Sequence, residues 1–488
     1  MGLIFNNHRE ASAQYQTGTT DRKPAAAGRF YPADPQELRA MLKKMFSEAK
    51  SCEYSQVLGI VSPHAGYLFS GTVAASGYNQ VDPEKQYENV FVIGSSHYIT
   101  LPGASVYNKG DYITPLGSVK VNTSLADKLI SENPVFAFSP DADRAEHCLE
   151  VQIPFLQYRL KQGFTLVPIV IGSQSASTCR VIAEALKPYF NERNLFVFST
   201  DFSHYPSWAD ARQADKATCD AIVSGKPDEL VRFLEDYRKK DIQNLSTNLC
   251  GWTSILTLLY LTSGDSQVEI HPVHYMNSGD TDFGDKKQVV GYWSLAVTKP
   301  FDFTRQEKIS LLDIARKAIE KHLHDRRIPE PDPAVSINLS VRAGAFVTLK
   351  EHGKLRGCIG RFTADLPLYK LISDLAVASA TEDTRFEPVD AAETDSLKIE
   401  ISVLSPLRKI KSIEQVTLGK HGIYIRKGHN SGTFLPQVAI ETGWTREEFV
   451  GHCARDKAAI GWNGWKDAEL FVYEACVFSE SELTGRKD

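Results

Sequence analysis

Three histidines of this sequence follow the ends of short apolar segments rich in β-branched and aromatic residues. The segments, each with the histidine that follows it, are Val57–Ser62 with His64, Asn89–Ser96 with His97, and Leu195–Thr200 with His204. Each segment is typical of a short, fully buried strand. Ligands of open α/β sheets bind beyond the carboxyl ends of parallel strands, so side chains placed there lie close together. We therefore expect the three imidazoles to meet in one crevice.

A cysteine completes this set of candidate ligands. Cys250 follows the polar stretch Asn244–Asn248 and precedes Gly251–Leu261, an apolar run that predicts a helix. The partial positive charge at a helix amino end favours the thiolate form of a nearby cysteine. Imidazole and thiolate suit Fe(II), Cu and Zn, and catalytic metal sites keep a vacant position. The residue types thus favour a metal site formed by His64, His97 and Cys250.

The same residues also have ordinary structural interpretations. A single histidine at a strand end more often bonds backbone groups than a metal, but the repeated placement, together with the thiol, favours a shared site. Asp201 and His204 leave the same strand. His204 could act as a general base, with Asp201 orienting a neighbouring imidazole. A surface Asp–His pair explains these two residues equally well.

The segment Glu146–Glu150 contains two carboxylates one helical turn apart and an imidazole, that of His147. An apolar stretch follows it, which places the segment next to the core. We expect Glu150 to support the catalytic groups and His147 to contact substrate. The alternative is solvated charge at the start of a helix.

A second candidate site lies in Lys354–Arg361, which combines two glycines with Arg356 and Cys358. As a loop, it could bind an anion through arginine and backbone N–H groups, or present the cysteine as a nucleophile. We expect Arg356 and Cys358 to contact substrate. A tight turn with solvated arginines is the alternative.

Length and composition limit the class of protein. A chain of 488 residues is too long for one core and predicts roughly two to four structural units. The net charge of -5 gives no support for nucleic-acid binding, and no apolar run approaches the roughly 20 residues of a membrane span. The cysteines show no C-x-x-C pairing, which favours reduced thiols. We expect a cytoplasmic protein with a loose leader over residues 1–21.

Alternating strand and helix patterns from residue 22 to residue 298 predict an α/β domain with a central sheet covered on both faces. The segment 299–304 breaks this pattern, and we interpret it as a linker. The remainder, residues 305–488, begins with an amphipathic helix and continues with segments that alternate apolar and polar residues. Such segments are typical of a half-exposed antiparallel sheet, so the second domain should be α+β.

Residues 22–298 resemble the Memo family. The motifs that carry the resemblance are Lys23–Ala25, Gly28–Pro32, Pro63–Tyr67, Ser70–Gly71, Gly94–His97, Glu146-His147-x-x-Glu150, Asp201–His204 and Cys250–Gly251. The resemblance implies a fold similar to the class III extradiol ring-cleaving dioxygenases, which bind iron through two histidines and a carboxylate. It also implies that His64, His97 and Cys250 occupy the metal-binding positions, and that His204 matches the catalytic base.

One departure from the dioxygenases affects the expected chemistry. Cys250 stands where they carry a glutamate, and a soft, oxidisable thiolate argues against ordinary ring cleavage. Members of the Memo family have been linked to iron or copper binding and to redox activity, and some have been treated as binding proteins without a metal. The resemblance therefore implies Fe(II) as the first candidate ion, with Cu or Zn as alternatives. The sequence contains no nucleotide-cofactor motif.

Residues from about 305 to 480 are similar to the AMMECR family. The resemblance is carried by Leu355–Gly360, Thr384–Phe386 and Gly432–Val438, although Glu382-Asp383-Thr384 replaces the usual Arg-Asp-Pro. In many prokaryotes the two families occur beside a radical S-adenosylmethionine protein, as the AmmeMemoRadiSam system. The fusion implies one shared pathway. The chain lacks the C-x-x-x-C-x-x-C cluster motif, so radical chemistry would belong to a partner.

Three hypotheses of function follow. The first is a metal-dependent redox enzyme acting on a small molecule or peptide, with a radical S-adenosylmethionine protein as partner. The second is an adaptor whose crevice binds peptides without chemistry. The third is a hydrolase in which Cys250 is the nucleophile and a histidine is the base.

Overall fold

The computed structural model describes residues 20–484, with gaps at 55, 238, 241, 328–338, 340, 363–365 and 411. Nearly all of the leader expected over residues 1–21 lies outside the described residues. The chain divides into two compact units, Met1–Pro300 and Phe301–Asp488. In the part of the chain that the structure covers, no helix combines the length and the apolar character needed to cross a membrane.

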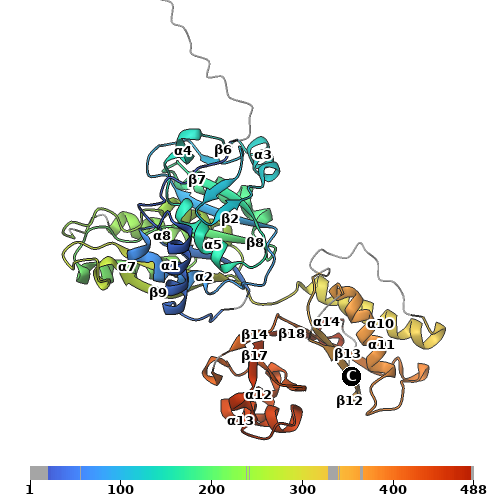
Figure 1. Ribbon diagram of the computed structural model, residues 1–488. Coiled ribbons are helices and arrows are strands. Elements are labelled where there is room, and N and C mark those ends of the chain that lie inside the picture. Colours follow the sequence, from blue (N-terminus) through green and yellow to red (C-terminus); the bar gives the residue numbers. More distant parts are fainter. Residues whose placement is uncertain are drawn as a thin grey trace, which may run out of the picture. The chain divides into compact units, whose positions relative to one another are not determined.

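The first unit is built on one eight-stranded sheet (Figure 1). Its strands are β1 (Val57–Ser62), β2 (Asn89–Ser95), β3 (Ala104–Val106), β6 (Phe136–Ala137), β7 (Thr165–Ile171), β8 (Asn194–Ser199), β9 (Glu269–Asn277) and β10 (Gly291–Thr298). The order is β6-β3-β7-β2-β8-β1-β10-β9. The four central strands, from β7 to β1, are parallel, whereas β3 and β10 pair antiparallel with them. A separate hairpin joins β4 (Tyr112–Thr114) to β5 (Gly117–Val119).

Helices cover both faces of this sheet. They are α1 (Pro35–Glu48), α2 (Tyr67–Tyr78), α3 (Thr123–Glu132), α4 (Pro140–Arg144), α5 (Ile153–Arg159), α6 (Ala176–Leu186), α7 (Trp208–Val223), α8 (Pro227–Tyr237) and α9 (Trp252–Thr262). Alternate residues of β2 enter different cores, because successive strand side chains point to opposite faces. Val90 and Val92 pack with α1, α2 and α5, whereas Phe91 and Ile93 pack with α6 and α9. The expected α/β class is confirmed.

The strand order explains why distant residues meet. Strands β2, β8 and β1 are neighbours and run parallel, so their carboxyl ends lie at one edge of the sheet. His97 follows β2, Asp201 follows β8 and His64 follows β1. Helix α9 packs against β2 and β8, which brings Cys250, just before its first turn, to the same edge.

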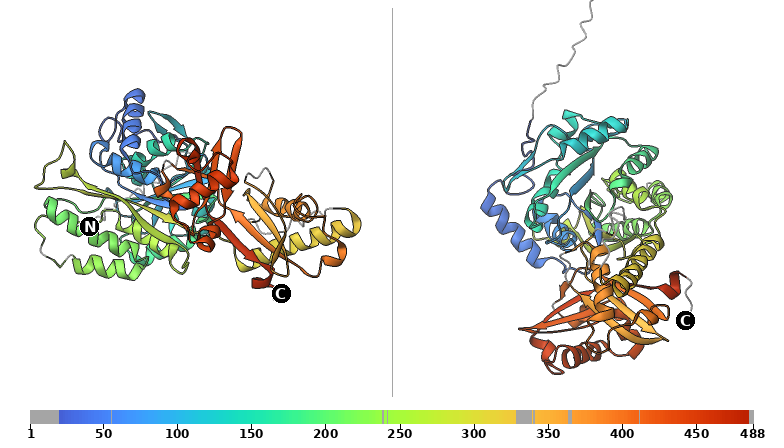
Figure 2. Two further views of the ribbon diagram at one scale, coloured as in Figure 1. Left: turned by 90° about the horizontal axis from the view of Figure 1, so that it is seen from below. Right: turned by 90° about the vertical axis from the view of Figure 1, so that its right-hand side faces the viewer.

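The second unit contains two antiparallel four-stranded sheets (Figure 2). The first has the order β12-β11-β13-β18 and consists of β11 (Ala345–Glu351), β12 (Lys354–Arg361), β13 (Leu397–Leu404) and β18 (Ala475–Ser479). The second has the order β14-β17-β15-β16 and consists of β14 (Arg408–Ile410), β15 (Gly422–Lys427), β16 (Asn430–Phe434) and β17 (Glu469–Tyr473). The helices are α10 (Arg305–Asp325), α11 (Leu368–Thr381), α12 (Pro436–Thr442), α13 (Arg446–His452) and α14 (Glu480–Leu483). The α+β class is therefore also confirmed.

The segment Lys354–Arg361 is not the loop that its glycines suggested, because it forms strand β12, paired along its length with β11. Its glycines serve close packing rather than flexibility. A Cβ atom on Gly357 would lie 2.1 Å from the backbone oxygen of Ser379, and one on Gly360 would lie 2.1 Å from the ring of Phe346. The absence of a side chain thus lets α11 and β11 approach the strand.

Candidate metal centre

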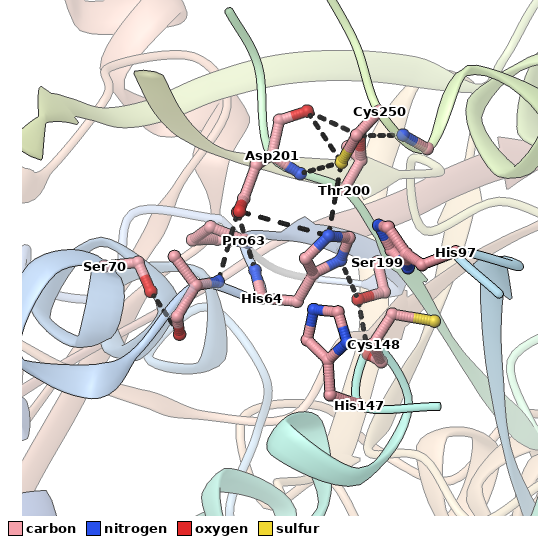
Figure 3. A network of polar contacts seen from close by, with 12 residues as sticks. Pro63, His64, Ser70, His97, His147, Cys148, Ser199, Thr200, Asp201 and Cys250 are labelled. Carbon is pink, nitrogen blue, oxygen red and sulfur yellow. Dashed lines mark hydrogen bonds and ion pairs between the residues drawn. The ribbon is translucent and has the colours of Figure 1, made fainter. Parts of the chain in front are cut away.

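His64 is fixed on both sides of its ring and is buried (Figure 3). Its Nδ1 lies 2.9 Å from the hydroxyl of Ser199 at the end of β8, and its Nε2 lies 3.2 Å from Sγ of Cys250. Its backbone N–H donates to Oδ1 of Asp201 at 2.8 Å. Burial lowers the pKa of His64. The neutral ring can therefore offer a nitrogen lone pair to a cation.

Cys250 sits one residue before Gly251, which caps the amino end of α9. Burial by itself would raise the pKa of the thiol, but the electrostatic interaction with His64 and hydrogen bonds with His64 and His97 outweigh this and lower it to about 6. The backbone N–H of Asp201 also donates to the sulfur at 3.2 Å. The thiolate expected from sequence is thus supported mainly by neighbouring imidazoles rather than by the helix end.

His97 is held by Glu146. Its Nδ1 lies 2.9 Å from Oε1 of Glu146, and its backbone N–H donates to Oε2 at 2.8 Å. Glu146 is buried, which opposes ionisation, yet its bonds to His97 lower its pKa to about 2. Burial alone would lower the pKa of His97, but hydrogen bonds to Cys148, Cys250 and Glu146 raise it well above its usual range. A carboxylate behind one ring nitrogen leaves the other nitrogen oriented for a ligand.

His147 stands beside both of these histidines. Its ring centroid lies 5.4 Å from that of His64 and 4.7 Å from that of His97. The ring also packs against Phe30, with a centroid distance of 4.5 Å. Burial lowers the pKa of His147 to about 4. We predicted His147 as a substrate contact, and the structure places it among the candidate metal ligands.

Two sets of side chains in the described residues have donor atoms close enough together to hold an ion. One is His64, His97 and His147, and the other is His97, Glu146 and Cys148, with all donor atoms in each set within 4.8 Å of one another. Cys250 adjoins the first set through its contact with His64. The structure therefore contains a cluster of two histidines and a cysteine that could bind a metal, with a third imidazole next to it.

Asp201 and His204 lie at the exit of β8, as the sequence suggested. Oδ1 of Asp201 accepts from the backbone N–H groups of His64 and Ala65, at 2.8 and 3.3 Å. Nδ1 of His204 lies 2.9 Å from the carbonyl oxygen of Phe202, so this nitrogen carries the proton and Nε2 is an acceptor. The next residue, Tyr205, has φ 71°, a left-handed conformation that is rare for an aromatic residue and is typical of strained functional segments.

Glu150 faces away from these groups. Its carboxylate accepts hydrogen bonds from Nη1 of Arg22, from the backbone N–H groups of Ala25 and Ala26, and from the hydroxyl of Tyr31, all between 2.7 and 2.8 Å. These partners saturate a fully buried carboxylate. The geometry gives Glu150 the task of anchoring residues 22–31.

Arg356 and Cys358 lie on β12 in the second unit. Nε and Nη2 of Arg356 each donate to the carboxylate of Glu393 at 3.0 Å. The backbone N–H of Cys358 donates to Asp383 at 2.8 Å, and its sulfur accepts from the hydroxyl of Thr348 at 3.3 Å. These contacts fix both residues, and their expected role in binding substrate stays a prediction.

Sequence reasoning missed two residues that orient the histidines. Glu146 entered the prediction only as part of its segment, and Ser199 only as a residue of the expected strand Leu195–Thr200. A signal for Ser199 was present, because serines precede all three strand-end histidines. The serine that bonds His64 belongs to the neighbouring strand, however, and single-segment patterns do not reveal contacts between strands.

Comparison with known proteins agrees with this architecture. A family model described as Memo-like protein matches residues 22–296, and a model described as AMMECR1 matches residues 312–478. A MEMO1 family protein of Thermoplasma acidophilum is 33% identical over 279 residues, which cover 57% of this chain and 99% of that protein. A MEMO1 family protein of Archaeoglobus fulgidus is 35% identical over 278 residues, 56% of this chain and 97% of its own length.

Solved structures include two uncharacterised proteins that are similar in part. One, from Pyrococcus horikoshii, is 34% identical and has a TM-score of 0.34, and the matched region covers 36% of this chain and 91% of that protein. The other, from Escherichia coli K12, is 14% identical with a TM-score of 0.33 and covers 49% of this chain and 98% of its own. With the Memo match spanning more than half of the sequence, this chain belongs to the Memo-like protein family and carries an AMMECR1 domain after its Memo domain.

Proposed function

We propose that the Memo domain binds one transition-metal ion through His64, His97 and Cys250 and acts as a metal-dependent redox enzyme. Fe(II) is the first candidate, and Cu or Zn are alternatives, because imidazole and thiolate suit all three. The observation that carries the proposal is the orientation of the donors. Nδ1 of each histidine is engaged, by Ser199 or by Glu146, and Nε2 of His64 points at the sulfur of Cys250.

The donor set fits such an ion. Two imidazoles whose outer nitrogens are hydrogen-bonded, together with a thiolate, match the ligand chemistry of mononuclear metal sites with a carboxylate or hydroxyl behind each histidine. When bound, the ion would supply a Lewis acid with a vacant position and, for iron or copper, a one-electron couple. Cys250 in place of a carboxylate makes redox chemistry more fitting than ring cleavage.

The surrounding residues have separate tasks in this proposal. Asp201 positions His64 by accepting a hydrogen bond from its backbone N–H. His204 keeps its proton on Nδ1 and can accept one at Nε2, which makes it the candidate general base. Glu146 holds His97 in one orientation. Glu150 contributes indirectly, by anchoring residues 22–31.

Metal analysis of protein purified and loaded with Fe(II) without oxygen tests this proposal. We expect about one ion per chain in the wild type and a loss of at least roughly tenfold in affinity in His97→Ala and Cys250→Ser. His324→Ala, at an exposed position on α10, and Cys179→Ser, in the buried core of α6, are matched controls that should bind metal normally. Substoichiometric metal in the wild type, or unchanged loading in His97→Ala, would refute it.

A specific observation favours one second candidate, a hydrolase with Cys250 as nucleophile. Its sulfur lies 3.2 Å from Nε2 of His64, the arrangement of a cysteine–histidine pair, and its pKa is lowered to about 6. Mass spectrometry after treatment with iodoacetamide separates the two. A metal-bound thiolate should react only after chelation, whereas a catalytic nucleophile should react equally with and without Fe(II).

We propose that a radical S-adenosylmethionine protein acts in the same pathway, as the fusion of the two families suggests. Affinity purification of the tagged full chain from its native cells, with His97→Ala as a comparison, tests this association. Recovery of no such protein from either sample would argue against it.

A further inference from the structure

His147 lies close enough to the proposed metal ligands to join them. A ring nitrogen of His147 lies within 4.8 Å of ring nitrogens of both His64 and His97. Figure 3 shows the three rings beside one another, with Cys250 on the far side of His64. The proposed three-ligand site makes no use of this third imidazole.

Among the residues that the structure describes, the buried Nδ1 atom of His147 has no hydrogen-bond partner. The nearest carboxylate oxygen, Oε1 of Glu146, is 3.4 Å away. That oxygen already accepts from Nδ1 of His97 and from the backbone N–H groups of His147 and Cys148. Buried polar atoms are nearly always paired, and an orphaned one indicates a water or an ion. Nδ1 of His64 and of His97, by contrast, each have a partner.

An amino-terminal strap, residues 22–31, holds the His147 segment in place. Arg22 is buried and donates from Nε to the carbonyl oxygen of Asp143, from Nη2 to that of Glu146 and from Nη1 to Glu150, at distances of 2.9, 2.6 and 2.7 Å. At the other end of the strap, Phe30 packs its ring against His147. The imidazole is thus supported by backbone anchoring on one side and by an aromatic ring on another.

We propose that His147 is a fourth metal donor, held there by the strap. This inference rests on the proposed metal site and extends it from two histidines and a thiolate to three histidines and a thiolate. Four donors are the number found in closed tetrahedral sites, whereas three leave a position open. A substrate or small ligand that reaches the ion must then add as a fifth ligand or displace His147.

Cobalt(II) is a suitable probe because its visible absorption reports coordination number and its thiolate band reports the bond to sulfur. Full-length protein is titrated with Co(II) without oxygen, and affinity and spectrum are recorded for wild type, His147→Ala and Cys250→Ser. We expect intense four-coordinate bands in the wild type. We expect weaker bands in His147→Ala and an affinity loss of at least the roughly 10- to 100-fold that changes around metal sites cause. Adding imidazole to His147→Ala should restore the wild-type spectrum.

His274→Ala is a matched control, because this half-buried histidine of β9 bonds Ser76 and is not part of the cluster. It should keep the wild-type spectrum and affinity. Unchanged affinity and band intensity in His147→Ala would overturn the fourth-donor proposal and leave the three-ligand site standing. Lower affinity with unchanged band intensity would overturn it too, because His147 would then only support other ligands. Failure of the wild type to bind Co(II) would overturn this inference and the proposed function together.

Discussion

Each unit of this chain places a cysteine and several charged side chains on or just beyond a strand, but the charged and polar groups of the two clusters have different partners. In the second unit, Arg356 is matched by Glu393 and Arg385 by Asp383, so each cation faces one carboxylate. In the first unit, His64 and Cys250 face each other, and a buried nitrogen of His147 has no hydrogen-bond partner among the described residues.

This difference indicates a structural role for the cluster of the second unit and a ligand-binding role for the cluster of the first. Arg356 on β12 donates to Glu393 and to the carbonyl oxygen of Glu387, which lie between α11 and β13. In the same segment, Asp383 accepts from Arg385 and from the backbone N–H of Cys358 on β12. A buried polar atom without a hydrogen-bond partner, such as Nδ1 of His147 among the described residues, is a cost to stability that a bound cation can remove. The polar cluster of the Memo domain is therefore the one suited to bind a cation. Three changes test this difference between the two units.

Breaking one ion pair in each unit should give the largest difference in the free energy of unfolding between the two units. Arg22 and Glu150 have side chains only 5% and 0% exposed, whereas Arg356 and Glu393 are 15% and 27% exposed. Arg22→Ala leaves a buried carboxylate unpaired and should lower the free energy of unfolding by about 3–5 kcal/mol. Arg356→Ala should cost about 1 kcal/mol or less. Urea unfolding measures both, and equal losses would contradict the contrast.

Acid should weaken the second unit through His421. This histidine is buried, and burial together with the charge of Arg408 lowers its pKa from 6.5 to about 4. The unfolded chain takes up the proton first, so the free energy of unfolding falls as pH drops from about 6.5 to about 4, by about 3 kcal/mol at most. In the first unit, burial raises the pKa of Asp215 to about 6, and the stability it contributes is instead lost as pH rises from 3.8 towards 6.

Hydrogen exchange followed by mass spectrometry resolves the two units in one sample. Peptides of β15 and β17 should lose protection as pH falls after correction for the intrinsic exchange rate, and His421→Gln should flatten that dependence. If the acid sensitivity of these peptides were unchanged in His421→Gln, it would arise from titratable groups other than His421.

Two glycine substitutions, Gly94→Ala and Gly357→Ala, should give the smallest losses of stability. Together they distinguish a general loss of stability from a loss of metal binding at the site. A Cβ on Gly94 would lie 2.4 Å from Sγ of Cys148, and one on Gly357 would lie 2.1 Å from the backbone oxygen of Ser379. Each change should cost about 1–3 kcal/mol through overpacking. Only Gly94→Ala should also weaken Co(II) binding, because Cys148 adjoins His147. Thermal melting and metal titration measure the two effects, and equal metal affinity in both variants would contradict this expectation.

The sequence predicted the strand-end geometry well because it rests on local rules. Apolar runs predicted the strands, and the parallel arrangement brings His64 and His97 together at one edge, with ring centroids 5.0 Å apart. The third imidazole of the cluster is His147, not the expected His204. Cys250 was placed correctly for a similar reason, since a polar stretch followed by an apolar helix marks a helix start. The fold classes of both units were predicted from the same alternation of strand and helix patterns.

The sequence failed where contacts depend on three-dimensional packing. Glu146 and Glu150 were expected on one helical face, but the helical turn begins only at Glu150, so the two carboxylates diverge towards His97 and Arg22. The glycines of Lys354–Arg361 suggested a loop, yet they allow neighbouring backbone to approach a strand. Neither outcome can be read from spacing, because both depend on segments far away in the chain.

The strap has a consequence for folding order. It anchors through Glu150 and covers His147, while the remaining donors come from the ends of β1 and β2 and from the start of α9. A nascent chain that lacks α9 cannot yet assemble the donor set, and one with a detached strap leaves His147 unsupported. Tight ion capture would therefore report that the whole Memo domain has closed, and loss of the ion would be an early sign that either end has come loose.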